Sequence, residues 1–255
     1  MPKHTSAHAA GIPCWSDLMS TDPKGARDFY AKIFGWTYTV AGPEFGFYAT
    51  ARQDGHAVAG VGGVPPGSNM PTTWSVYFAT DNLAADLERV KALGGSVLMP
   101  PMQIGQEGSM AMFLDPAGAA FGLWQSGNHT GYRLTDAHGA KGWVELASRD
   151  LAKSRAFFSK LLNMEAVLMQ GMEYYTLDRG GEQYAGMMGL PPEAGPIPSH
   201  WGIYWIVDNT DAVIKAATAA GAKVIDPAED TPYGRLATLM DPQGGMFKLM
   251  QPLPR

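Results

Sequence analysis

The sequence has little of several features that mark common protein classes. It has one cysteine, Cys14, in 255 residues, which excludes a disulfide within the chain and fits a reducing compartment. Charged residues make up 17% of the chain, the net charge is −5 and no basic run is present, so a nucleic-acid partner would find no electrostatic footprint. No window approaches the ~18 consecutive apolar residues of a membrane-spanning helix, and the first residues hold no apolar signal segment. We therefore expect no nucleic-acid or membrane partner and a cytoplasmic protein, with secretion without a conventional signal peptide as the alternative.

Glycine and proline are plentiful, which favours tight turns and short strands over a helical bundle. The chain also repeats itself at half its length. The stretch from Trp15 to Asp22 recurs from Trp143 to Asp150, and in both copies a Trp stands two residues before an acid and seven before an Asp that opens a helix. Because Trp15 and Trp143 are 128 positions apart, as are Asp22 and Asp150, the repeat indicates a duplicated pair of domains.

Each half divides again into two β-α-β-β-β units. In the first unit we expect strands at 15–20, 36–40, 45–52 and 57–61, and in the second strands at 97–99, 110–114 and 120–125 follow the helix. An Asp-Pro-x-Gly turn precedes the last strand of each half, at 115–118 and 241–244. Helical apolar spacing follows four aspartates and ends near a Gly or Asn. The predicted N-capping residues are Asp22, Asp81, Asp150 and Asp208.

This pattern predicts an α+β protein with two tandem domains. Four β-α-β-β-β units should give two curved mixed sheets, each a cup with helices on its outer side. We assign residues 1–11 to a flexible tail, 12–127 to domain 1, 128–140 to a linker and 141–255 to domain 2. The sequence leaves open which units pair to form each cup.

Four such units, with the Asp-Pro-x-Gly turns, resemble the vicinal oxygen chelate superfamily, which includes glyoxalase I, extradiol dioxygenases and bleomycin-resistance proteins. The resemblance covers residues 12–252, nearly the whole chain. The twin Pro/Gly-x-Trp-x-Asp/Glu-Leu stretches look like those of tandem-domain, glyoxalase-like actinobacterial proteins, among them a mycobacterial culture-filtrate antigen. Fold alone does not fix an activity.

The resemblance implies a divalent metal at the floor of each cup, held by His, Gln or Glu. The six positions that can be matched hold none of these residue types, and an indole, a glycine or an ammonium cannot bind Mg, Fe or Zn. We therefore expect no metal and no cofactor. The six histidines are scattered, so a replacement metal site is the less favoured alternative. The six matched positions are Trp15, Trp143, Ser75, Gly202, Gly122 and Lys248.

Strand alternation places other residues in the cups, because residues i, i+2 and i+4 of a strand share one face. The walls would be Trp and Met with one acid per domain, which is typical of an apolar small-molecule pocket. The candidate ligand-binding residues are Trp15, Asp17, Met19, Tyr77, Trp124, Trp143, Glu145, Tyr204, Arg235 and Lys248.

The two acids, Asp17 and Glu145, are the candidate catalytic residues, as general bases or cation ligands, with a structural role as the alternative. Lys248 stands where a metal would have stood and could pair with either acid. Arg235 could bind an anionic ligand at a cup mouth, and Tyr77 and Tyr204 could equally be core residues.

Three functions remain open. The first is a metal-independent protein that binds a small apolar or amine-bearing molecule. The second is a glyoxalase-like lyase, isomerase or hydroxylase that uses carboxylate acid–base chemistry. The third is a non-catalytic interaction protein. Whether the chain is an enzyme, and whether it acts as a monomer or a homodimer, the sequence leaves undecided.

Overall fold

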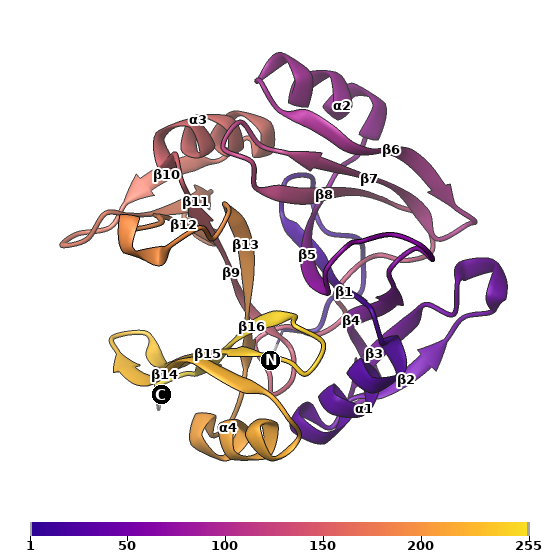
Figure 1. Ribbon diagram of the computed structural model, residues 1–255. Coiled ribbons are helices and arrows are strands. Elements are labelled where there is room, and N and C mark those ends of the chain that lie inside the picture. The colour runs from indigo at the N-terminus through magenta and orange to yellow at the C-terminus, as the bar shows by residue number, and fades with distance from the viewer. Residues whose placement is uncertain (1, 254–255) are drawn as a thin grey trace.

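The computed structural model describes residues 2–253 and consists of two eight-stranded mixed sheets (Figure 1). The first sheet and its helices are β1 (Pro13–Ser20), α1 (Pro23–Phe34), β2 (Thr37–Val40), the 3-10 turn η1 (Pro43–Phe45), β3 (Ala49–Gln53), β4 (His56–Gly63), β5 (Thr73–Ala79), α2 (Leu83–Ala92), β6 (Ser96–Ile104), β7 (Gly108–Leu114) and β8 (Ala120–Ser126). The second set is β9 (Lys141–Ser148), α3 (Leu151–Leu162), β10 (Glu165–Leu168), β11 (Tyr174–Arg179), β12 (Glu182–Gly189), η2 (Pro192–Ala194), β13 (His200–Ile206), α4 (Thr210–Ala219), β14 (Lys223–Thr231), β15 (Gly234–Met240) and β16 (Met246–Gln251).

Consecutive β-α-β-β-β units share a sheet, so each cup is formed by the two units of one half of the chain. The strand order is β2-β3-β4-β1-β5-β8-β7-β6 in the first sheet, and β10-β11-β12-β9-β13-β16-β15-β14 in the second. In each sheet the opening strands of the two units are antiparallel neighbours at the centre, and each pairs in parallel with the last strand of its own unit. The predicted α+β fold with two curved mixed sheets is therefore confirmed.

The main core lies between the convex sides of the two sheets. Alternation sends Leu18 and Phe78 of the first sheet, and Trp201 and Trp205 of the second, into this core. Phe78 and Trp201 have ring centroids 5.1 Å apart, so the two sheets pack directly against each other. Helix α1 contacts α4 and α2 contacts α3, which closes the two flanks of the core. The helices thus cover the convex sides and leave the concave sides free of helices (Figure 1).

The Asp-Pro-x-Gly turns join the two domains. The Oδ1 atom of Asp241 accepts the amides of Gln243 and Gly245, which fixes the turn, while Oδ2 accepts the Tyr30 hydroxyl of α1 at 2.9 Å. In the other domain Asp115 fixes its own turn and accepts the Ser154 hydroxyl of α3. Each turn therefore docks on the first helix of the opposite domain.

Helix starts differ from expectation in the second unit of each half. Asp22 and Asp150 cap α1 and α3 as predicted. The caps of α2 and α4 are Asn82 and Asn209, whose Oδ1 atoms accept the amides of Ala85 at 3.0 Å and Ala212 at 2.9 Å. The predictions of Asp81 and Asp208 as caps were wrong because these helices begin one residue later, which places the Asn at the capping position.

Other boundaries also shift. The strand expected from residue 45 begins at Ala49, because Pro43 starts a 3-10 turn that includes Phe45. The strand expected at 97–99 extends through β6 to Ile104 and forms an edge of the first sheet. No helix among residues 2–253 is long and apolar enough to cross a membrane.

The segment predicted as a flexible tail lies along the linker. The His4 amide donates to the Arg133 carbonyl at 3.1 Å, and the His8 ring bonds to the Tyr132 carbonyl at 3.0 Å. Lys3 and Leu134 form an isolated antiparallel bridge. Residue 1 of the tail lies outside the described residues. The tail and linker together pack beside the start of β1, at one end of the first cup.

Candidate functional site

The sheet registers bring most of the predicted residues together on the two concave sides, which we call the first cup and the second cup. In the first cup Trp15 lies opposite Tyr77, and Tyr77 lies beside Gly122. In the second cup Trp143 lies opposite Tyr204, and Tyr204 lies beside Lys248. Asp17 and Glu145 are two residues further along the same strands and so share these faces.

Two tyrosines that the sequence reasoning missed, Tyr48 and Tyr174, complete the floors, one in each cup. The Trp15 Nε1 donates to the Tyr48 hydroxyl at 2.9 Å, and the Trp143 Nε1 donates to the Tyr174 hydroxyl at the same distance. Both hydroxyls occupy space that a glycine leaves free, since a Cβ at Gly60 would lie 1.7 Å from the Tyr48 oxygen. The corresponding distance from Gly186 to Tyr174 is 1.8 Å.

The acid of the first cup is only partly satisfied. Asp17 is 6% exposed, and its Oδ2 accepts the hydroxyls of Tyr48 and Tyr77, both at 3.3 Å. Its Oδ1 is buried without a hydrogen-bond partner. Burial raises the pKa of Asp17 to about 7, and the two tyrosine hydroxyls counteract part of that rise. Asp17 can therefore hold a proton near neutral pH.

The linker covers one end of the first cup. The His129 ring packs edge-on against Trp15 with centroids 4.3 Å apart, and its carbonyl accepts the Trp124 Nε1 at 2.9 Å. The Tyr132 hydroxyl bonds to Ser16 at the start of the same strand. Trp15 is 3% exposed and Trp124 is 7% exposed. Burial lowers the pKa of His129 to about 4, so this ring is neutral at physiological pH.

The acid of the second cup is paired with a base. The Lys248 Nζ lies 2.6 Å from the Glu145 Oε1 and 3.2 Å from the Tyr204 oxygen. The Tyr204 hydroxyl donates to the same carboxylate oxygen at 3.1 Å. In the first cup the equivalent of Lys248 is Gly122, whose missing side chain is replaced by the Tyr77 ring, 2.1 Å from where a Cβ would be. One exchange of glycine for lysine thus gives the second cup a fixed cation.

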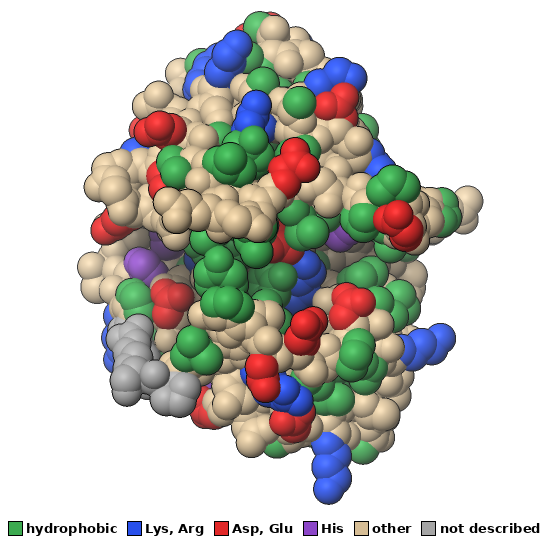
Figure 2. Space-filling view, turned by 90° about the vertical axis from the view of Figure 1, so that its left-hand side faces the viewer, with side chains coloured by type: hydrophobic (Ala, Val, Ile, Leu, Met, Phe, Trp, Pro, Cys, Tyr) green, Lys and Arg blue, Asp and Glu red, His purple; other side chains and the backbone are tan. Residues whose placement is uncertain are grey.

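The second cup is open. Trp143, Lys248 and Met250 are all partly exposed. The space-filling view of this face shows a hollow with apolar side chains inside it and acidic and basic side chains in and around it (Figure 2). At the rim, the Tyr233 hydroxyl of the β14–β15 turn lies 3.9 Å from the sulfur of Met169, which follows β10, so one contact joins the two edges of the sheet there.

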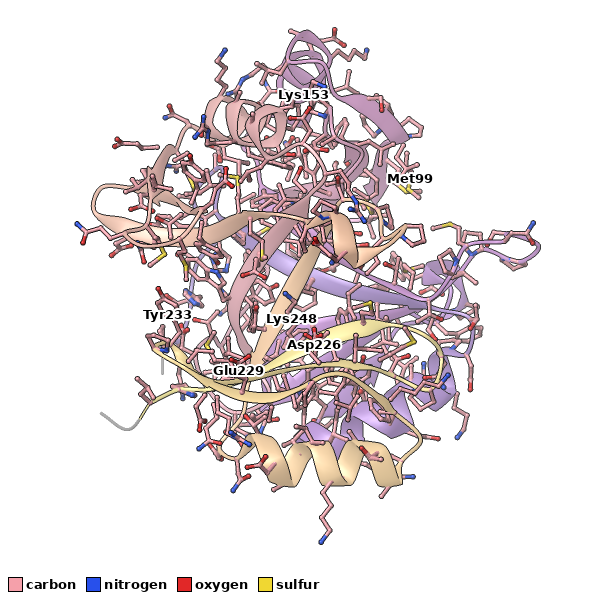
Figure 3. All side chains as sticks on the ribbon, turned by 60° about the vertical axis from the view of Figure 1, so that its left-hand side comes forward. Met99, Lys153, Asp226, Glu229, Tyr233 and Lys248 are labelled. Carbon is pink, nitrogen blue, oxygen red and sulfur yellow. The ribbon has the colours of Figure 1, made fainter. Side chains whose placement is uncertain are left out.

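The outer walls of the two cups have diverged. In the first cup the register pairs Met99 with Met112, and a second pair of methionines, Met102 and Met110, follows. At the equivalent places the second cup has Asp226 paired with Thr238, and Glu229 paired with Leu236. Figure 3 shows Asp226 and Glu229 on the side of the molecule that carries Lys248. The first cup is rich in sulfur and apolar, while the second has charge at its floor and its rim.

Not every predicted residue reaches a cup floor. Arg235 neighbours Leu236, which faces the cup, so alternation turns its side chain to the other face of β15. There its guanidinium bonds to Asp211 of α4 and to Asp230, both at 3.0 Å. The structure therefore places Arg235 beside α4 and away from the cup mouth. Met19 lies at the rim of the first cup, next to Gly62.

The cups do not fit the divalent metal that the fold family would supply. Each floor offers a single carboxylate, and that of Glu145 is bonded to a lysine. Within residues 2–253, no three His, Cys, Asp or Glu side chains come close enough together to hold a metal ion. A catalytic site of this kind needs about three protein ligands. The donor chemistry disagrees with a metal here, and metal independence stays a prediction that metal analysis can test.

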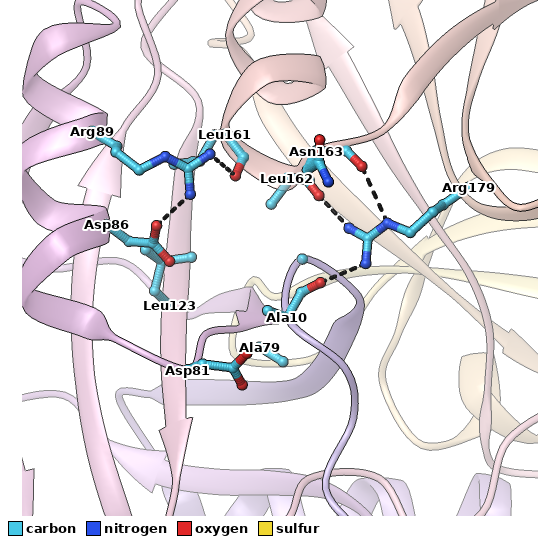
Figure 4. Close-up of a pocket in the computed structure, with 11 residues that line it drawn as sticks. Ala10, Ala79, Asp81, Asp86, Arg89, Leu123, Leu161, Leu162, Asn163 and Arg179 are labelled. Atoms are coloured by element: carbon cyan, nitrogen blue, oxygen red, sulfur yellow. Dashed lines mark hydrogen bonds and ion pairs between the residues drawn. The ribbon is translucent and has the colours of Figure 1, made fainter.

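A separate cavity of about 320 Å³ lies where the two domains meet, and Figure 4 shows it. Its two arginines are already engaged. Arg89 donates to the carbonyls of Lys160 and Leu161 at the end of α3, and Arg179 donates to those of Ala10 and Asn163. These bonds satisfy carbonyls at the C-terminal end of α3 and tie the domains together, which is a structural role.

The fold and the twin cups agree with the comparisons to known proteins. Residues 6–123 and 141–249 match the family described as the Glyoxalase/Bleomycin resistance protein/Dioxygenase superfamily. The chain belongs to this superfamily. It is 39% identical over 264 residues to the protein named "Putative glyoxylase CFP32" of Mycobacterium tuberculosis, with both chains fully covered. It is 37% identical to the anthracycline biosynthesis protein DnrV of Streptomyces peucetius, over 95% of this chain and 94% of that one.

Solved structures of this fold include a metal-bound enzyme. The Mn(II)-bound glyoxalase from Novosphingobium aromaticivorans matches with a TM-score of 0.65 and 15% identity, covering 96% of this chain and 83% of that one. The 2,2′,3-trihydroxybiphenyl 1,2-dioxygenase from Sphingomonas wittichii matches with a TM-score of 0.63 and 15% identity, covering 95% and 91%. At this identity the likeness shows the fold alone.

Proposed function

We propose that the chain binds a small, largely apolar molecule with a flat ring in the second cup, without a metal ion. The observation that carries this proposal is the contrast between the cups. The linker ring of His129 covers Trp15 in the first cup, whereas Trp143 is partly exposed at the floor of an open hollow. An apolar concave surface with a few fixed polar groups is the usual form of a ligand site.

The relatives support a ring-bearing ligand. DnrV carries the name of an anthracycline biosynthesis protein, and anthracyclines are polycyclic aromatic compounds. A partly exposed indole such as that of Trp143 offers a flat surface on which a ring can stack. The amine-bearing ligand that the sequence also suggested fits the second cup less well, because a ligand ammonium would meet the Lys248 ammonium at the floor.

A second candidate function is acid–base catalysis at the first cup. It is favoured by the unpaired Oδ1 of Asp17 and by a pKa of about 7, which lets this carboxyl give or take a proton at neutral pH. The linker cover makes this the weaker of the two proposals. This function would be favoured over binding if the wild-type chain turns over a substrate and Asp17→Asn loses the turnover but still binds the ligand.

Replacing Trp143 by Ala should weaken binding of ring-bearing molecules at least about tenfold, because the variant loses the stacking surface at the floor. The measurement is the dissociation constant of each variant for a panel of polycyclic aromatic compounds, obtained from titrations that are monitored by ligand-observed NMR. Lys153→Met, on the exposed side of α3, is the control and should bind as the wild type does. Equal affinity of Trp143→Ala and wild type would exclude the second cup as the site.

A further inference from the structure

We infer that the second cup recognises its ligand through a carbonyl oxygen, which accepts the N–H of Lys248 that no described residue takes. The inference rests on the proposed function and narrows it, because it names the polar group that the apolar ligand must carry. The residues that support it are Lys248, Glu145 and Tyr204 at the floor.

Among the described residues, the hydrogen bonds at the floor leave one donor of Lys248 without a partner. A lysine ammonium has three N–H groups. One bonds to the Glu145 Oε1 at 2.6 Å and one to the Tyr204 oxygen at 3.2 Å, and Tyr204 in turn donates its hydroxyl to the same carboxylate oxygen. No acceptor among the described residues takes the third. Since the Lys248 side chain is 18% exposed, this N–H is accessible from the open cup.

The position of the ammonium is fixed before any ligand arrives. The Lys248 stem lies over Gly202, where a Cβ would stand 3.3 Å from Cε, so glycine leaves the room that the stem fills. The Nζ also lies 4.8 Å from the centre of the Tyr204 ring. Glu145 and Tyr204 are therefore positioning residues for Lys248. A donor held in place loses little freedom when it bonds a ligand.

The charge at the floor favours a neutral acceptor over a ligand ammonium. Glu145 balances the charge of Lys248, so the pair is neutral as a whole and a buried ligand anion is not required. A neutral carbonyl can accept a hydrogen bond from the ammonium without adding an unpaired charge to the cup. A ligand ammonium at the same place would face the like charge of Lys248, which is unfavourable.

The walls fit a flat apolar skeleton around that oxygen. Trp143, Leu236 and Met250 are partly exposed and belong to the strands around Lys248. The register puts Met250 opposite Leu236, next to the pair of Lys248 with Thr238. The first cup cannot work in this way, because the place of Lys248 is taken there by Gly122 and the Tyr77 ring.

The test compares two naphthalenes that differ in one group. 2-Acetylnaphthalene carries a carbonyl, and 2-isopropenylnaphthalene replaces its oxygen with a methylene of nearly the same shape. Calorimetric titration of the wild type should give about tenfold tighter binding of the ketone, as expected for a hydrogen bond from a charged donor. The infrared carbonyl band of the bound ketone should move to lower frequency relative to the free ketone in a hydrocarbon solvent.

The matched variant is the double change Glu145→Gln with Lys248→Met, which removes both charges and avoids an unpaired buried carboxylate. The double variant should bind the ketone as weakly as the wild type binds the olefin, and its affinity for the olefin should not change. The carbonyl band of the bound ketone should return towards its position in hydrocarbon. Lys153→Met should keep the tenfold preference.

The outcomes separate the inference from the proposed function. Equal affinity of the wild type for the two probes, or a preference that survives in the double variant, overturns the inference and leaves the aromatic site in place. If neither probe binds the wild type, the proposed aromatic site itself is wrong and the inference falls with it.

Discussion

Replacing Asp17 by Asn should make the protein more stable above neutral pH, by roughly 2–4 kcal/mol near pH 8. Burial raises the pKa of this carboxyl from 3.8 to about 7 in the folded chain. Well below pH 4 the carboxyl is protonated in both the folded and the unfolded chain, so its burial does not lower stability through ionisation. As the pH rises to about 7, the unfolded chain ionises first and the wild type loses stability. The asparagine variant has no such loss.

The measurement is the free energy of unfolding of both proteins in urea at about pH 4, 6 and 8. The two proteins should be similar at the lowest pH and should diverge as the pH rises. Asp28→Asn is a suitable control, since Asp28 is exposed and paired with Lys24, and it should show no such divergence. If Asp17→Asn were less stable than the wild type near pH 8, the ionised Asp17 carboxylate would be stabilised in the folded chain by contacts that the geometry does not contain.

Replacing Lys248 alone by Met should destabilise the protein by about 3 kcal/mol, because it leaves Glu145 charged and nearly buried without its cation. The remaining donors to this carboxylate come from tyrosines, which do not balance its charge. The double change Glu145→Gln with Lys248→Met should recover most of the loss and lie within about 1 kcal/mol of the wild type.

Urea unfolding at neutral pH measures all three free energies, and the coupling between the two sites follows from the double-mutant cycle. Lys153→Met removes an exposed lysine paired with Asp150 and should change stability little. A single Lys248→Met variant as stable as the double variant would mean that Glu145 does not depend on Lys248, and the lysine would have no structural reason to stand at the floor.

Much of the fold could be predicted from the sequence because its signals are local and repeated. The recurrence of Trp15 to Asp22 as Trp143 to Asp150 marks the two domains, and apolar alternation in β1 identifies the face that carries Asp17. Alternation also turned Lys248 into a cup but left open whether it meets Asp17 or Glu145, and the structure pairs it with Glu145. Helix caps were harder, because Asp81 and Asn82 are adjacent and either can cap.

The remaining features depend on contacts between distant parts of the chain. Tyr48, just before β3, and Tyr174, the first residue of β11, reach the cup floors from outside the motifs that the sequence showed. The only local signals for them are Gly60 and Gly186, which appear as ordinary strand glycines in the sequence. The cover of the first cup by His129 could not be read from the linker composition, because it depends on where the chain returns after β8.

The position of Arg235 could not be predicted from its charge alone. The sequence offers a cation near the expected mouth, but the face of a strand residue depends on the register of its neighbours. The β15–β16 register turns Arg235 towards Asp211 of α4, where it makes ordinary ion pairs. Lys248, one strand away, is turned into the cup by the same register. Arg235 and Lys248 were both candidate ligand-binding cations in the sequence, but only Lys248 lies in a cup.

The most direct test of the account is a calorimetric titration of chelator-treated wild-type protein with 2-acetylnaphthalene, repeated after addition of Mn²⁺ or Zn²⁺. A metal-independent second cup predicts one ligand bound per chain, with an affinity that neither chelation nor added metal changes. Loss of binding on chelation with recovery on adding the ion, or two equivalent ligands per chain, would contradict it.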